Sequence, residues 1–346
     1  MKQMVCGAFV ARAWTLMVLL AASCLLAGSA MGEAANGACV AAGDGAKTVT
    51  REAFRIRDPF VLPENGTYYL YESKAWSGGR GVFVRTSKDL ENWTERQPVM
   101  TLPADSACTA VWAPEVHKYN GAYWLFTTLT FPADAAKPVP SLCEKGFSGG
   151  ETMHPRGVWV FRSDRPTGPF KPVKDGSVTP AEWMCLDGTL WVEDGTPWMV
   201  FCHEWIQTGN GRMMAAPLTK DLSSFAAEPI QLFKAADVPG GGQVTDGPFL
   251  FRTQDGALRM IWSNFIKGSG YCVLQCASES GSVRGPWKKH VPLYARDGGH
   301  GMLFRRADGT RMLTIHQPNK SPDERMRLFF VRETPEGLSC APAAGK

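Results

Sequence analysis

The sequence lacks the features of nucleic-acid-binding and membrane-spanning proteins. It has no basic run, and its 20% of charged residues leave a net charge of only +4 over 346 residues. Nucleic acid is therefore not an expected partner. Beyond residue 30, no apolar stretch approaches the ~20 residues of a membrane-spanning helix. Paired Cys-x-x-Cys spacing is also absent, which argues against a zinc site. We expect a monomeric mature protein with no membrane span.

The N-terminus has the character of a secretory signal peptide, residues 1–34. Two basic residues precede an apolar run that ends in small residues, and cleavage after Ala30 or Ala34 fits this pattern. A lipoprotein anchor at Cys24 is an alternative, although Ala21 stands where such sites carry Leu or Val. A retained membrane anchor is the third option. We predict a secreted or periplasmic protein.

Export would permit disulfide bonds. The cysteines that remain after removal of the leader include Cys185 and Cys202, which lie in one predicted hairpin. We expect these two to pair. The other pairings considered are Cys272 with Cys276 and Cys108 with Cys143.

Glycine and tryptophan are abundant, with 36 and 12 residues, and this composition favours many short strands joined by turns. The clearest hairpin lies in residues 185–205, where an Asp194-Gly195 turn separates two apolar, aromatic-rich runs. In an antiparallel hairpin the start of the first strand and the end of the second share one edge. Asp187 and Glu204 are therefore expected to be neighbours.

This hairpin plan recurs along the chain. The five hairpins occupy residues 60–73, 116–128, 190–205, 249–264 and 302–316. A third apolar strand follows each hairpin, and several are followed by a turn and an aromatic residue that indicate a fourth. Five repeats of a four-stranded antiparallel unit predict an all-β fold, the five-bladed β-propeller. We place it at residues 51–335, after a linker at 35–50 and before a tail at 336–346, with the loop 132–151 on its binding face.

Carboxylates stand at the head of four of the five predicted innermost strands. They are Asp58, Glu115, Asp187 and Asp246. The heads should meet at the mouth of the central channel, where mutual repulsion separates proton affinities. Hydrolysis of a glycosidic bond needs this separation, because one carboxylate activates water while another group protonates the leaving oxygen. An Asp before Gly or Pro can also be a turn residue that caps its own backbone.

At this point the chain resembles glycoside hydrolase family 43. The matching motifs are RDPF, WAPEV, LDGTLWVEDGTPWMV, TDGPFLF and GGHGMLF, one for each blade in order, within residues 52 to 332. The resemblance implies a five-bladed propeller enzyme that cleaves arabinose-, xylose- or galactose-containing plant polysaccharides with inversion. It also implies that Asp58 is the general base, and that Asp187 orients the general acid and raises its pKa.

The general acid is where the sequence departs from this family. The family places a Glu before the fourth-blade Gly-Pro, whereas this chain has Asp246, which is one methylene shorter. Asp246 can be the general acid if the substrate binds closer to it. Alternatively Glu204, at the end of the third-blade hairpin, can be the general acid. We favour Glu204 for its reach and for its expected neighbour Asp187, while noting that Glu204 could instead pair with a basic residue.

Several further residues are candidates for the site. His300 resembles the family's axial histidine, which implies calcium in the central channel, although the chemistry requires no cofactor and calcium prefers oxygen ligands. The candidates for contact with sugar are Trp76, Trp112, His203, Trp205 and His316. For each Trp, packing between blades is the alternative role.

Two other functions stay open. The missing fourth-blade Glu fits a noncatalytic glycan-binding propeller. A fructan-acting hydrolase is the second, but its Asn-Asp-Pro-Asn-Gly motif is absent around Asp58.

Overall fold

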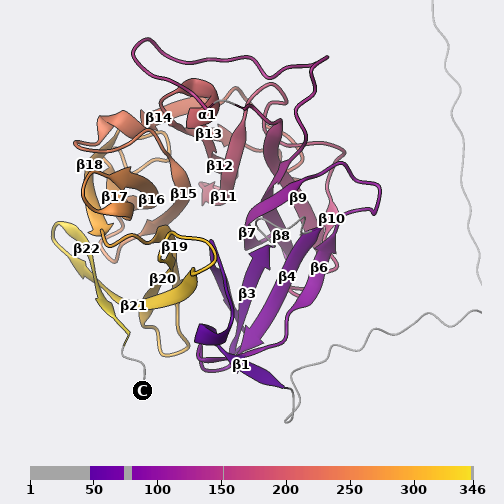
Figure 1. Ribbon diagram of the computed structural model, residues 1–346. Coiled ribbons are helices and arrows are strands. Elements are labelled where there is room, and N and C mark those ends of the chain that lie inside the picture. Colours follow the sequence, from indigo (N-terminus) through magenta and orange to yellow (C-terminus); the bar gives the residue numbers. More distant parts are fainter. Residues whose placement is uncertain (1–46, 74–79, 151, 344–346) are drawn as a thin grey trace, which may run out of the picture. The chain divides into compact units, whose positions relative to one another are not determined.

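The computed structural model describes residues 47–73, 80–150 and 152–343, and these form five four-stranded sheets arranged as the blades of a propeller (Figure 1). Each blade is an antiparallel meander of four strands that follow one another in chain order. The first blade holds β2 (Phe60–Glu64), β3 (Thr67–Ser73), β4 (Gly81–Ser87) and β6 (Gln97–Thr101). The second holds β7 (Ala110–Tyr119), β8 (Ala122–Thr130), β9 (Arg156–Ser163) and β10 (Lys171–Pro172). The predicted fold class is confirmed.

The remaining three blades repeat this order. The third holds β11 (Cys185–Glu193), β12 (Thr196–His203), β13 (Arg212–Pro217) and β14 (Ile230–Lys234). The fourth holds β15 (Asp246–Arg252), β16 (Leu258–Ile266), β17 (Gly270–Ser278) and β18 (Trp287–Tyr294). The fifth holds β19 (Gly299–Arg305), β20 (Arg311–Gln317), β21 (Arg325–Thr334) and β22 (Gly337–Pro342). One short helix, α1 (Trp205–Thr208), follows β12.

Both predicted boundaries of the propeller need correction. The short strand β1 (Thr48–Thr50) pairs with β5 (Asn92–Thr94), so the end of the expected linker belongs to the folded unit. The expected tail forms β22, the outer strand of the fifth blade, because Leu338 packs into the core at 5% exposure while its neighbours bond to β21. The signal peptide, the Cys24 anchor and most of the linker lie outside the described residues.

The hairpin turns agree with the sequence in the first three blades. Asp194 and Gly195 both have positive φ, and Glu193 pairs with Thr196 across a two-residue turn. The last two hairpins instead close through five-residue loops. In the fourth blade Arg252 pairs with Leu258, and only Gly256 of that loop has positive φ.

The core lies between neighbouring blades. Val61 and Val116 are fully buried in one cluster that joins the first blade to the second, and Met302 brings the fifth blade into it. No described strand passes from the last blade to the first, so side chains and loops close the ring. Buried Glu324, in the loop after β20, binds Arg55 with a 2.8 Å ion pair and accepts the Ile56 N–H through its backbone carbonyl.

The expected disulfides do not form among the described cysteines, all of which are free. Leu186, not Cys185, is opposite Cys202. This one-residue offset sends the two sulfur atoms to opposite faces of the sheet, and the two cysteines join different core clusters. Cys272 and Cys276 lie four residues apart on one extended strand, roughly 13 Å by strand rise. No described helix is long and apolar enough to cross a membrane.

Candidate active site

A repeated kink shapes the head of every innermost strand. At the kink of each blade, one residue has a positive φ of 43–55°. These residues are Asp58, Ala113, Asp187, Gly247 and His300. In the second to fifth blades the kink coincides with a bulge in the pairing with the next strand. Four of the five are not glycine, and each pays about 1–2 kcal/mol for this conformation, which is a cost that functional sites often carry.

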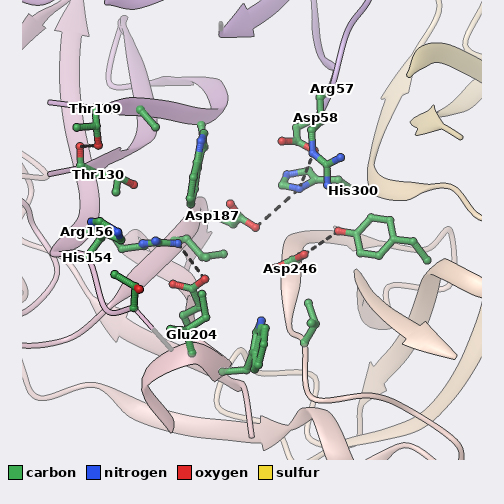
Figure 2. A pocket seen from close by; sticks show the side chains of 18 of the residues that line it. Arg57, Asp58, Thr109, Thr130, His154, Arg156, Asp187, Glu204, Asp246 and His300 are labelled. Carbon is green, nitrogen blue, oxygen red and sulfur yellow. Dashed lines mark hydrogen bonds and ion pairs between the residues drawn. The ribbon is translucent and has the colours of Figure 1, made fainter. Parts of the chain in front are cut away.

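Three of these kinked residues meet at the centre of the propeller (Figure 2). The Nδ1 atom of His300 lies 3.3 Å from Oδ1 of Asp58 and 3.7 Å from Oδ2 of Asp187. The N–H of Gly247 donates to the same Asp187 oxygen at 3.0 Å. Gly247 must be glycine, because a Cβ there would lie 2.9 Å from the His300 ring.

Asp58 is held as a carboxylate. Burial by itself raises the pKa of Asp58, but His300, a hydrogen bond from His316 and the guanidinium of Arg57 together hold it well below its usual range. His316 Nδ1 lies 3.1 Å from Oδ1 of Asp58, and Arg57 Nε lies 3.8 Å away. His316 is fully buried beneath the carboxylate. The expectation that it contacts sugar is therefore wrong, and its place is that of a support for Asp58.

Asp187 is 6% exposed and has the opposite character. Burial raises its pKa well above the usual range, and the nearby Asp58 carboxylate adds to this, against the hydrogen bond from Gly247. Thr128 on β8 fixes the Asp187 backbone by accepting its N–H at 3.0 Å. Asp187, on the third blade, thus contacts residues of the second, fourth and fifth blades next to the base.

Glu204 begins α1 from the end of β12 and forms a buried ion pair with Arg156 at 2.9 Å (Figure 2). The guanidinium lies 4.5 Å over the Trp112 ring. Oε2 of Glu204 is buried and has no hydrogen-bond partner among the described residues. Burial raises the pKa of Glu204 to about 7, Arg156 opposes this and Asp246 adds to it. The neighbouring carboxylate that raises this pKa is thus Asp246, not Asp187 as the sequence had suggested.

Asp246 is half-buried and stands one residue before the kink of its blade, so it does not share the register of Asp58 and Asp187. Its Oδ2 accepts a 2.9 Å hydrogen bond from the Tyr271 hydroxyl. Burial and then Asp187 raise the pKa of Asp246 to about 7, against His300 and the Tyr271 hydrogen bond. The site therefore contains two carboxyl groups with pKa values near 7, Glu204 and Asp246, and one whose pKa is far lower, Asp58.

These groups line one pocket of about 630 Å³. It contains all four predicted catalytic residues, together with His300, Trp112 and Trp205. One face of Trp112 is covered by Arg156, so its ring is at most half available for stacking on a sugar. Trp76 lies outside the described residues.

His203 does not reach the pocket. It is fully buried, stacks on Trp183 at 4.4 Å, and lies 2.8 Å from Oε1 of Gln207. The same amide donates to carbonyl groups of Pro140 and Glu182. His203 therefore helps to anchor α1, and the expectation that it contacts sugar is wrong. The described part of the predicted binding loop, residues 132–150, also contacts α1 through backbone hydrogen bonds, and none of these residues lines the pocket.

Sequence reasoning missed Arg156, Tyr271 and Phe265, which also line the pocket. The sequence did contain a signal for Arg156 and Tyr271. In an antiparallel meander the first and third strands begin at the same end. Arg156 begins β9 and Tyr271 is the second residue of β17, so both positions could have been assigned to the rim.

The pocket does not contain a ready-made metal site. The described residues hold no group of three or more His, Cys, Asp or Glu side chains that could bind a metal ion. The Nδ1 atom of His300 instead faces the two carboxylates.

Comparison with known proteins identifies relatives over most of the propeller. A sequence model of glycosyl hydrolases family 43 matches residues 52–334. The extracellular endo-alpha-(1->5)-L-arabinanase 1 of Bacillus subtilis (strain 168) is 24% identical over 203 residues, which cover 56% of this chain and 55% of that protein. The chain thus spans about half the length of that relative.

Solved structures also resemble this chain. An endo-arabinase from Bacteroides thetaiotaomicron VPI-5482 is 35% identical with a TM-score of 0.71, and the match covers 83% of this chain and 98% of that one. An endo-1,4-beta-xylanase from the same organism is 24% identical with a TM-score of 0.67, covering 86% and 97%. The second likeness shows the fold alone.

Proposed function

The chain belongs to glycosyl hydrolases family 43, and on this premise we propose that it is a glycosidase that cleaves arabinose- or xylose-containing plant polysaccharides with inversion. One observation carries the proposal. A single pocket holds Asp58, whose pKa lies below its usual range, together with Glu204 and Asp246, whose pKa values are about 7. Groups whose environments separate their proton affinities supply the base and the acid of such a reaction.

Arabinan is the first substrate to test, since the 35% identical structure is an endo-arabinase. Xylan is the second. Galactose-containing glycans, which the sequence resemblance also allows, complete the set.

In the proposed reaction Asp58 accepts a proton from a water molecule as that water attacks the anomeric carbon. The new bond forms between the water oxygen and the anomeric carbon while the bond to the leaving oxygen breaks. A protonated carboxyl group on the other side of the sugar gives its proton to the leaving oxygen. Inverting enzymes leave roughly 6.5–9.5 Å between the two carboxyl groups for the attacking water. Asp187 contacts His300 beside the base and accepts the Gly247 N–H beside Asp246.

We propose Glu204 as the proton donor. Glu204 lines the pocket with a pKa raised to about 7, and Arg156 holds Oε1 in place while buried Oε2 has no partner among the described residues. Asp246 is the second candidate. It stands where the family carries its acid, but Oδ2 already accepts from Tyr271.

We further propose that the mature protein is secreted and monomeric, and that calcium can bind in the central channel. The extracellular arabinanase supports secretion. His300 could contribute one nitrogen to calcium, and water would supply the other ligands. A calcium-dependent rise in melting temperature that chelation reverses would show binding independently of activity.

The function is tested by incubating the purified protein with arabinan, xylan, galactan and the corresponding aryl glycosides. We expect hydrolysis of at least one polysaccharide, and a loss of about 10³-fold or more in Asp58→Asn, because that variant lacks the base. Binding without hydrolysis by the wild type would instead identify a noncatalytic glycan-binding propeller.

A further inference from the structure

Phe265 is exposed at the mouth of the pocket although it is a large apolar residue. Four large hydrophobic side chains in the described part of the chain are exposed, and of these Phe265, at 42%, lines the pocket. Trp205, Ile206 and Val244 line the pocket as well. An exposed apolar surface continuous with a binding pocket marks a contact site for a ligand.

The Phe265 ring is held in place by the residues of the site itself. It pairs with Tyr271 across β16 and β17, and the two ring centres lie 5.0 Å apart. Tyr271 in turn stacks on His316 at 5.6 Å, beneath Asp58. Phe265 is therefore the outermost member of an aromatic row that runs from the base to the pocket mouth.

The backbone of Phe265 is fixed too. Its N–H donates to Oδ1 of Asn264 at 2.8 Å, and its carbonyl accepts the Gly242 N–H at 2.7 Å. A side chain at Gly242 would lie 3.4 Å from the Phe265 Cβ. A preorganised ring loses little conformational freedom on binding, so it can support a ligand at low entropic cost.

We propose that Phe265 is a specificity-determining residue that stacks on a sugar unit next to the one whose bond is cleaved. The C–H face of a sugar is apolar and suits a fixed aromatic ring, whereas the carboxylates deeper in the pocket suit hydroxyl groups and the reacting bond. Tyr271 donates a hydrogen bond to Asp246, and the Phe265 ring packs against Tyr271, so Phe265 lies beside the reacting centre. This inference rests on the proposed function, and it makes the preferred substrate a chain of several sugars.

The test compares Phe265→Ala with the wild type on an aryl monoglycoside and on arabino- or xylo-oligosaccharides of increasing length. Removing the ring takes away contact area that is equal in the ground and transition states, which raises KM and leaves kcat unchanged. We expect KM for the trisaccharide and longer chains to rise about 5- to 20-fold, from the apolar area that a sugar face covers. The KM for the aryl monoglycoside should not change.

Two matched variants separate stacking from a general effect. Phe265→Trp keeps an aromatic surface and should retain low KM values. Val291→Ala removes an apolar side chain of equal exposure, 42%, on β18 of the same blade but outside the pocket lining, and should leave all KM values unchanged.

An equal rise in KM for every chain length, or no rise at all, would overturn the proposal. Calorimetric titration of Asp58→Asn with a trisaccharide, with and without Phe265→Ala, gives the same comparison without turnover. A protein that hydrolyses nothing but binds the trisaccharide through Phe265 would disprove the proposed function while supporting the stacking site.

Discussion

The carboxylates of the pocket differ in proton affinity because their neighbours differ. Asp58 lies among His300, His316 and Arg57, which favour its charged form over the effect of burial. Asp187, with comparable burial, faces another carboxylate and has the opposite shift. Amino-acid type alone therefore does not assign the roles. The contacts of each carboxylate do.

This difference predicts the pH dependence of hydrolysis. The donor must be protonated, and Glu204 and Asp246 both have pKa values raised to about 7. On a substrate with a poor leaving group, kcat/KM should therefore fall as the pH rises above about 7. The acid limb should lie at unusually low pH, because Asp58 stays ionised there. The profile of kcat/KM against pH reports these groups in the free enzyme.

Glu204→Gln and Asp246→Asn serve as the paired variants for this experiment. The variant that lacks the donor should lose the basic limb and about 10²–10⁴-fold in rate on poor leaving groups, with little loss on nitrophenyl glycosides. Glu204→Gln is expected to show this pattern. The pattern in Asp246→Asn alone would transfer the donor role to Asp246, and a steep basic limb retained in both would contradict acid catalysis by either.

At the level of the element, the kink at the head of each innermost strand is the feature of the repeated hairpin from which the site is built. The kink occurs in all five blades, yet its residue is Asp in two, and Ala, Gly or His in the others. At Gly247 a side chain would strike the His300 ring. The backbone shape is thus common to the blades, and the side chains are specialised.

Gly247→Ala tests this arrangement, with Gly256→Ala as its control. Both glycines have positive φ, but a Cβ at Gly256 meets nothing within 4 Å. Gly256→Ala should lower the free energy of unfolding by about 1 kcal/mol and leave activity intact. Gly247→Ala should cost more and lower kcat at least about 10-fold, because displacing His300 by a few tenths of an ångström moves the groups around Asp58. Urea unfolding and steady-state kinetics measure both, and equal kcat values would contradict this role for the kink.

The elements also show what the sequence could and could not reveal. Asn-Gly and Asp-Gly pairs between apolar runs recur in all five repeats, so the five blades were predictable, although the last two hairpins close through longer loops. The bulge is a non-local feature of pairing, which is why the register of Asp246 was misjudged. Strand alternation alone could not show that His203 faces buried Gln207, nor that Arg156, distant in sequence, binds Glu204.

At the scale of the whole molecule, the propeller brings residues from different blades to one place. Asp58 and His300 lie at opposite ends of the folded chain and are 3.3 Å apart in space. The buried Glu324 that closes the ring contacts Arg57 at 3.3 Å, and Arg57 contacts Asp58. Closure of the propeller and support of the base therefore share residues.

The stereochemical course of hydrolysis tests the central claim most directly. Proton NMR during the first minutes of arabino-oligosaccharide cleavage, before mutarotation, reveals the anomer that forms first. A water activated by Asp58 on the face opposite the leaving group must give the inverted anomer. First appearance of the retained anomer, or hydrolysis that persists undiminished in Asp58→Asn, would contradict the account.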